Sequence, residues 1–301
     1  MNFLAFPLSF MLAFLTFHEN LANESVKISE NDQLYPHDVQ SEQIKDADMM
    51  IEESSNHTKQ GLGKLFHKID ANQDLFVTKD ELIRWIVQYN EEILMREAKF
   101  ELKRIDKNND NFVTWEEFMK EHYGNLSLNE DKVNSEHNEI IQFFKDDKYR
   151  FTIADADKNE RLSIEELKAF LRPHNHVEML DYEVYRALIE YDKNKDKVID
   201  RTEFIQTQYG SNKLTLQQKS YVNKVFDKYD TDHNNQLSEN EMKVWLKPDI
   251  IQFAQTESQY LLNVSDLNKD EKLSKEEILE NFGHWVSSKA TNFGADFKDE
   301  L

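Results

Sequence analysis

The chain of 301 residues has no cysteine, only six glycines and only four prolines. Without cysteine it forms no disulfide, and catalysis by a thiol is excluded. So few glycines and prolines argue against many tight hairpins, so we expect an all-α fold with short connections. Small helical units that lack disulfides need another source of stability.

Positive charge is also scarce. The sequence has 37 Lys and Arg against 58 Asp and Glu, a net charge of -21 at pH 7. A surface this acidic repels nucleic acid and anionic lipid and attracts cations. We therefore expect no nucleic-acid partner and a cationic ligand.

Long apolar stretches are confined to the amino terminus. Residues 3–17 carry no charge and have the length of the hydrophobic region of a secretory signal peptide, which is too short to span a bilayer. We predict a signal peptide over residues 1–22 and no direct membrane insertion of the mature chain. The last four residues spell the retrieval signal K-D-E-L, namely Lys298, Asp299, Glu300 and Leu301. Leader and tail predict the endoplasmic reticulum lumen, with the K-D-E-L receptor as a partner.

One twelve-residue pattern occurs six times, and we number its copies loop 1 to loop 6. Each has Asp at position 1, Asp or Asn at positions 3 and 5, and Glu at position 12. Calcium takes six to eight oxygen ligands, which short side chains at alternate positions, the carbonyl of position 7 and one long bidentate carboxylate supply. The pattern is that of the EF-hand calcium loop, so Ca²⁺ is the predicted cofactor. The predicted ligands are Asp70, Asn72, Asp74, Phe76 and Glu81; Asp106, Asn108, Asp110, Phe112 and Glu117; Asp155, Asp157, Asn159, Arg161 and Glu166; Asp192, Asn194, Asp196, Val198 and Glu203; Asp230, Asp232, Asn234, Gln236 and Glu241; and Asp266, Asn268, Asp270, Lys272 and Glu277.

Position 8, which calcium does not touch, is aliphatic in every copy. In a pair of EF-hands this residue forms a short antiparallel bridge between the two loops, where such side chains pack well. A merely hydrophilic turn has no reason to keep it. The six residues are Val77, Val113, Leu162, Ile199, Leu237 and Leu273.

The loop starts are separated by 36, 49, 37, 38 and 36 residues. We predict six EF-hands in three helix-loop-helix pairs, each made of two hands adjacent in sequence. The predicted domains are residues 61–124 (hands 1 and 2), 138–210 (hands 3 and 4) and 216–290 (hands 5 and 6). They follow a disordered acidic lead at 23–60 and precede a tail at 291–301.

The whole resembles the CREC family, the reticulocalbins and calumenin. The more specific features are the E-F-x4-Y-G endings after Glu117 and Glu203, the F-L-x-P and W-L-x-P turns, and the segment Ser288 to Gly294. Family members typically end in H-D-E-F or H-D-E-L, whereas Lys298 takes the His place here. The resemblance implies a low-affinity calcium protein of the secretory pathway that associates with lumenal client proteins.

The loops also predict weak binding. Position 6 normally needs glycine because φ is positive there, yet no loop has glycine at this position. A left-handed backbone costs a residue with a side chain about 1 to 2 kcal/mol, and less for Asn. We expect dissociation constants on the order of 10⁻⁴ to 10⁻³ M, with hands 2 and 5, which carry Asn there, above hand 1, which carries Leu75.

Two further expectations concern modification and chemistry. Asn56 and Asn125 lie in N-x-S/T sequons that we expect to be accessible and glycosylated. The alternative function, a lumenal enzyme or a purely structural protein in which calcium only stabilises the fold, finds no G-x-S-x-G motif or phosphate loop in the sequence. We therefore expect a calcium buffer and calcium-responsive adaptor or chaperone-like regulator, and no enzyme.

Removal of calcium is expected to loosen the structure. A half-saturated site adds about 0.4 kcal/mol to the free energy of unfolding, so six independent sites add roughly 2.5 kcal/mol. Circular dichroism and gel filtration with and without about 1 mM calcium measure this as lower helicity and a larger radius in the calcium-free chain. Unchanged helicity and an unchanged radius would contradict this prediction.

Overall fold

A computed structural model describes residues 58–124, 135–209, 215–292 of the chain. Contacts divide these into two compact units. One unit comprises Glu92–Asp249; the described part of the other comprises residues 58–91 and 250–292. The predicted signal peptide, the acidic lead up to residue 57, both predicted glycosylation sites and the K-D-E-L tail lie outside the described residues.

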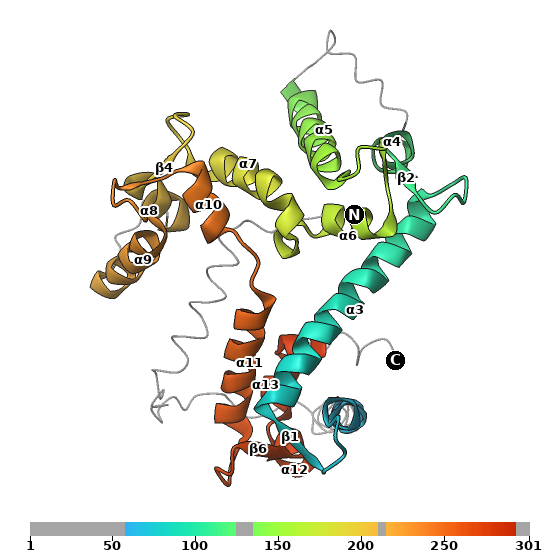
Figure 1. Ribbon diagram of the computed structural model, residues 1–301, viewed down its shortest axis with the longest axis vertical. Helices are drawn as coiled ribbons and strands as arrows, with labels where there is room; N and C mark the ends of the chain where they lie inside the picture. The colour runs from blue at the N-terminus through green and yellow to red at the C-terminus, as the bar shows by residue number, and fades with distance from the viewer. Residues whose placement is uncertain (1–57, 125–134, 210–214, 293–301) are drawn as a thin grey trace, which may run out of the picture. The chain divides into compact units, whose positions relative to one another are not determined.

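The fold is all-α, as predicted, with very short strands at the loops (Figure 1). The unit that holds loops 1 and 6 consists of a helix over residues 58–69, β1 (Phe76–Thr78), the first half of α3 (Lys79–Ile105), α11 (Ile250–Ser265), β6 (Lys272–Ser274), α12 (Lys275–Glu280) and α13 (Phe282–Val286). The unit that holds loops 2 to 5 consists of the rest of α3, β2 (Val113–Thr114), α4 (Trp115–Tyr123), α5 (Ser135–Ala154), β3 (Arg161–Leu162), α6 (Ile164–Leu171), the 3₁₀ turns η2 (Pro173–Asn175) and η3 (Val177–Met179), α7 (Leu180–Tyr191), β4 (Ile199–Asp200), α8 (Arg201–Tyr209), α9 (Leu216–Tyr229), β5 (Gln236–Leu237) and α10 (Glu239–Trp245).

Helix ends follow the local sequence. Helix α6 stops at Leu171, two residues before Pro173, and α10 stops at Trp245, three residues before Pro248. Proline cannot continue a helix and disfavours helical geometry in the residue before it. Helix α4 ends instead at Gly124, whose positive φ of 62° suits glycine and whose N–H donates to the carbonyl of Lys120.

The strands join the loops in antiparallel pairs, with position 8 opposite position 8 every time. Val77 pairs with Leu273, Val113 with Leu162, and Ile199 with Leu237. All six side chains are fully buried, which confirms the role predicted for this position. Hand 1 therefore pairs with hand 6, hand 2 with hand 3, and hand 4 with hand 5.

These bridges differ from the predicted pairs, which joined hand 1 with hand 2, hand 3 with hand 4 and hand 5 with hand 6. Two loops bridge side by side only if the chain between them turns back. Helix α3 starts at position 10 of loop 1 and runs without a break for 27 residues to the residue before loop 2. The helix contains neither glycine nor proline, so the chain cannot reverse its direction between loops 1 and 2. Each of these two loops therefore bridges to another loop. The boundaries at 61–124, 138–210 and 216–290 do not enclose bridged pairs.

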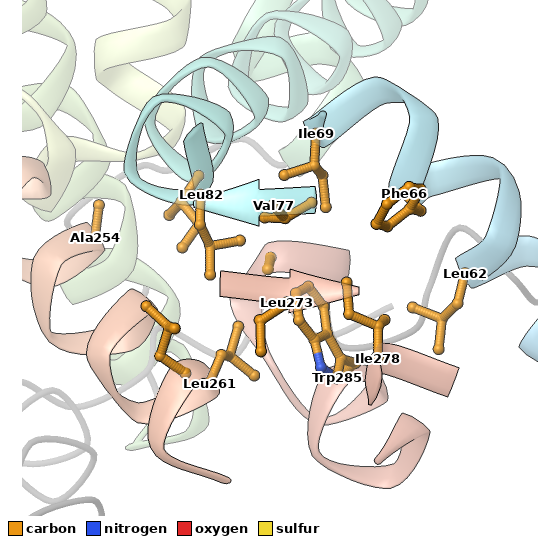
Figure 2. Close-up of a cluster of buried hydrophobic side chains, with 13 residues drawn as sticks. Leu62, Phe66, Ile69, Val77, Leu82, Ala254, Leu261, Leu273, Ile278 and Trp285 are labelled. Carbon is orange, nitrogen blue, oxygen red and sulfur yellow. The ribbon is translucent and has the colours of Figure 1, made fainter. Parts of the chain in front are cut away.

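A hydrophobic cluster holds hands 1 and 6 together. Figure 2 shows Val77 and Leu273 on the facing strands, with Phe66 and Ile69 from the helix before loop 1 on one side and Trp285 from α13 on the other. All of these side chains are at most 2 % exposed. Burying a large apolar side chain contributes about 1.5 to 3 kcal/mol, so this cluster supplies much of the stability of the pair.

The segment after α13 is fastened to the same pair. The Trp85 indole donates to the carbonyl of Ala290 at 2.8 Å, and the Ser288 hydroxyl donates to buried Glu257 at 2.6 Å. The Thr291 hydroxyl donates to the carbonyl of Trp285 at 2.7 Å. The family resemblance rests partly on the sequence from Ser288 to Gly294. These contacts give a structural reason for that sequence as far as Asn292, the last residue that the structure describes.

In the other unit, polar contacts between α5 and α7 connect the pair of hands 2 and 3 to the pair of hands 4 and 5. The Tyr182 hydroxyl of α7 donates to Asp146 of α5 at 2.9 Å, and the Arg186 guanidinium lies 3.7 Å from the same carboxylate. Tyr149 of α5 contacts the rings of both Tyr182 and Tyr185. Helix α7, which leads into loop 4, is thus held against the helix that leads into loop 3.

The bridges predict which parts of the chain lose protection from hydrogen exchange when one buried bridge residue is truncated. Leu273→Ala removes a buried side chain and costs about 2 to 5 kcal/mol of stability. Because β6 bridges to β1, hydrogen exchange followed by mass spectrometry should show lost protection over residues 58–79 as well as 250–286. Protection in α9 and α10 of hand 5 should persist.

Leu237→Ala is the matched control in hand 5. Leu237→Ala should increase hydrogen exchange in hand 4, the bridged partner of hand 5, and leave hand 6 protected. If Leu273→Ala instead exposes hand 5 while hand 1 stays protected, the bridging described above is contradicted.

Candidate metal centre: six EF-hand loops

Each loop begins directly where a helix ends. The position-1 aspartate follows the last helical residue, and its backbone N–H still donates to the carbonyl four residues earlier. In loop 1 the Asp70 N–H lies 2.9 Å from the Phe66 carbonyl, and in loop 4 the Asp192 N–H lies 3.1 Å from the Leu188 carbonyl. The first carboxylate is therefore anchored by the helix and directed into the loop that follows.

That carboxylate organises the turn. In all six loops its Oδ2 accepts the backbone N–H of position 6 at 2.8 to 3.0 Å. Its Oδ1 accepts the N–H of position 5, as in loop 1, where Asp74 donates to Asp70 at 3.2 Å. The chain thus wraps around the position-1 oxygens, which are among the predicted calcium ligands.

Wrapping so tightly requires a left-handed backbone at two places. Position 6 has φ between 64° and 71° in the six loops, which confirms the strain predicted there. Position 4 has φ between 58° and 65°, which the sequence analysis missed. Only Asn109 and His233 among its residues favour this geometry, so the sequence gives little signal. The position-4 residues are Gln73, Asn109, Lys158, Lys195, His233 and Lys269.

The position-12 glutamate closes the loop from the other end. Its Oε2 accepts the N–H of position 9 at 2.8 to 3.0 Å in every loop. In loop 5 its Oε1 also accepts the Thr231 N–H at 2.7 Å, across the loop. The carboxylate is therefore drawn back over the loop toward position 1, where a bidentate calcium ligand is needed.

Position 9 is a functional position that the ligand pattern did not single out. Its side chain caps the exiting helix, and with Glu at position 12 it forms a capping box, as Ser238 and Glu241 do in α10. The signal was present, because [ST]-x-x-E precedes the apolar stripe in five loops. Loop 4 has Asp200 instead, which accepts the Glu203 N–H at 2.9 Å. The five hydroxyl residues are Thr78, Thr114, Ser163, Ser238 and Ser274.

Hydrogen bonds lower the pKa of four of these glutamates. Burial acts to raise the pKa of Glu241, but hydrogen bonds from Ser238 and Thr231 outweigh it and bring the pKa to about 2. Burial is likewise outweighed at Glu81, Glu117 and Glu277, whose pKa values are lowered from the usual 4.5. A carboxylate that is charged at neutral pH can bind a cation without first losing a proton.

Positions 3 and 5 always form one Asn–Asp pair joined by a side-chain hydrogen bond. In loop 1 the Asn72 amide donates to Asp74 at 3.1 Å, and in loop 3 the order is reversed, with Asn159 donating to Asp157 at 2.8 Å. Where Asp occupies position 3, three carboxylate oxygens come within 4.8 Å of one another. These groups are Asp155, Asp157 and Glu166 in loop 3, and Asp230, Asp232 and Glu241 in loop 5.

The donor set suits calcium. Every predicted side-chain ligand supplies oxygen, and a hard cation with flexible coordination prefers carboxylate and amide oxygens. The position-7 carbonyls, as well as the occupancy and ranking of the individual loops, remain predictions. Within the described residues no helix is long and apolar enough to cross a membrane.

Comparisons with known proteins agree with the assignment of EF-hands in this chain. The family model described as an EF-hand domain pair matches residues 59–121, 144–208 and 219–283. Reticulocalbin-2 from Mus musculus is 31 % identical over 85 % of this chain and 82 % of its own length, and reticulocalbin-2 from Rattus norvegicus gives the same figures. Reticulocalbin-2 from Crotalus adamanteus is 29 % identical over 82 % of this chain and 83 % of its own.

The strain at position 6 gives a direct test. Leu75 has φ of 71° and a side chain that is 66 % exposed, so replacing it by glycine removes the strain and little packing. Leu75→Gly should tighten calcium binding at loop 1 by about five- to thirtyfold, measured by calorimetry. Asn111→Gly in loop 2 is the matched control and should gain less, since Asn tolerates this geometry. Equal gains in calcium affinity at both loops would show that backbone strain at position 6 does not cause the difference in affinity between loops 1 and 2.

Proposed function

This chain belongs to the CREC family of reticulocalbins, and from that premise we propose that it is a low-affinity calcium buffer and calcium-responsive adaptor of the endoplasmic reticulum lumen. That it binds calcium follows from the six EF-hand loops and the family. The low affinity, the compartment and the adaptor role are the proposal.

One observation carries the low affinity. All six loops have the same left-handed position 6 and none has glycine there. The residues are Leu75, Asn111, Glu160, Lys197, Asn235 and Glu271. Each loop thus spends part of its binding free energy on holding an unfavourable backbone, which suits sites that work at millimolar rather than micromolar calcium.

The K-D-E-L ending supports the compartment. Sites with dissociation constants on the order of 10⁻⁴ to 10⁻³ M are nearly empty at cytosolic calcium and partly filled in a calcium-rich store. Retrieval to the lumen would keep the chain where its sites respond to changes in calcium. The tail and the loop chemistry therefore support the same location independently.

The adaptor role rests on the family. We propose that lumenal client proteins bind surfaces whose arrangement depends on calcium, because each bridged pair joins two loops through β-strands of only two or three residues. A change at one loop then passes directly to its partner. The alternative, a lumenal enzyme stabilised by calcium, is less well supported, since the clustered carboxylates of loops 3 and 5 are calcium ligands by pattern.

Calorimetric calcium titration together with a lumenal pull-down tests this function. The chain should bind calcium with dissociation constants on the order of 10⁻⁴ to 10⁻³ M and retain different partners with and without calcium. The control is a chain with Glu→Gln at position 12 of all six loops, which keeps the size of each side chain but removes its charge. Submicromolar binding would contradict the low affinity, and a calcium-insensitive partner set would contradict the adaptor.

A further inference from the structure

Arg201 of hand 4 reaches into the calcium site of hand 5. It is the first residue of α8 and occupies position 10 of loop 4. Its guanidinium donates to Asp227 at 2.5 Å and to Asn223 at 3.2 Å, both on α9, and lies 4.5 Å from the centre of the Phe226 ring. The side chain is 27 % exposed, so it is held mostly against its partner hand.

Two of its contacts are with loop 5 itself. The Arg201 Nε donates to the side-chain oxygen of Asn235, the strained position-6 residue, at 3.2 Å. One terminal nitrogen lies 3.9 Å from Oδ2 of Asp230. That oxygen also accepts the Asn235 N–H, and the Asp230 side chain is only 2 % exposed. A positive charge therefore stands beside a buried carboxylate that calcium is predicted to bind.

Position 10 reaches toward the partner hand elsewhere as well. The Lys79 ammonium donates to Gln259 of α11 at 2.6 Å, seven residues before loop 6. Lys275 lies next to Gly63, seven residues before loop 1, just as Asn223 lies seven residues before loop 5. The bridging thus places position 10 over the partner's entering helix, and the long planar fork of Arg201 extends from there to the partner's loop.

We propose that Arg201 sets the calcium affinity of hand 5, acting from the paired hand. The inference rests on the proposed function, since it concerns how tightly one of the calcium loops binds. A fixed cation beside Asp230 repels an incoming cation and competes for the same carboxylate. Partial burial limits the screening of this repulsion by water. Because Asp227 shares the guanidinium, the reduction in affinity is moderate, about three- to tenfold.

The proposal also links two sites. Arg201 follows Asp200, the position-9 residue of loop 4, which accepts the N–H of the position-12 Glu203. Repulsion between calcium in loop 5 and the guanidinium would act on Arg201, and through it on the start of α8 and on the closing glutamate of loop 4. Coupling between two binding sites is reciprocal. The factor by which calcium in loop 5 changes the affinity of loop 4 therefore equals the factor by which calcium in loop 4 changes the affinity of loop 5.

Nuclear magnetic resonance of the ¹⁵N-labelled chain during a calcium titration tests the proposal site by site. The backbone amides of Asn235 in loop 5 and Asn111 in loop 2 are suitable reporters, because each donates to the position-1 carboxylate of its loop. In Arg201→Gln the midpoint for Asn235 should fall about three- to tenfold, while that for Asn111 stays unchanged. At 0.5 M KCl the difference should shrink, because salt screens the charge.

Two variants separate charge from structure. Arg201→Lys keeps the charge but lacks the planar fork that reaches loop 5, so its Asn235 midpoint should lie between those of the natural chain and Arg201→Gln. Lys79→Gln makes the same change in net charge on the other unit and should leave the Asn235 midpoint unchanged. An unchanged or higher Asn235 midpoint in Arg201→Gln overturns the proposal, and so does a lowered midpoint in Arg201→Gln whose difference from the natural chain does not shrink at 0.5 M KCl. If Asn235 of the natural chain ignores calcium while Asn111 responds, calcium binding by hand 5 itself is refuted.

Discussion

The antiparallel bridge between two calcium loops is the contact on which the rest of the structure depends. It places one aliphatic side chain from each loop back to back, with Val77 against Leu273, Val113 against Leu162 and Ile199 against Leu237. Hydrophobic clusters gather around all three bridges. Both strands of each bridge belong to calcium loops. The buried contact between the two strands therefore also fixes the positions of the loops that bind the metal. In a chain without disulfides, the link between folding and calcium follows from this arrangement.

The bridge was predictable from sequence, but its partners were not. An aliphatic residue at position 8 in all six loops is a local signal, because only a paired loop buries it. Which loop it meets depends on whether the connecting chain reverses, and regular spacing does not reveal that. The information lay in α3, whose 27 residues lack glycine and proline. Spacing favoured the pairing of hand 1 with hand 2, which the uninterrupted helix between their loops excludes.

The predicted calcium ligands could be chosen from the sequence more readily than the groups that hold them in place. Carboxylates at positions 1 and 12 are fixed by the chemistry of the ion, and the structure gives them matching roles in every loop. Position 4 escaped notice because Gln or Lys occupies it in four of the six loops, and neither residue type indicates a left-handed backbone. Position 9 escaped notice because its task is to cap a helix. Arg201 acts across a bridge, so its role appears only when the partner of loop 4 is known.

The pairing of hand 1 with hand 6 has a consequence for synthesis. Val77 is synthesised about 200 residues before Leu273, so hand 1 has no bridge partner until hand 6 has been made. Hands 2 to 5 have all their partners earlier and can fold while the chain is still growing. The fastening of Ser288 and Ala290 to the first pair completes that unit just before the terminus. A chain truncated in its last thirty residues would keep the bridges of hands 2 to 5 and leave the apolar side chains of hand 1 without the partners that bury them.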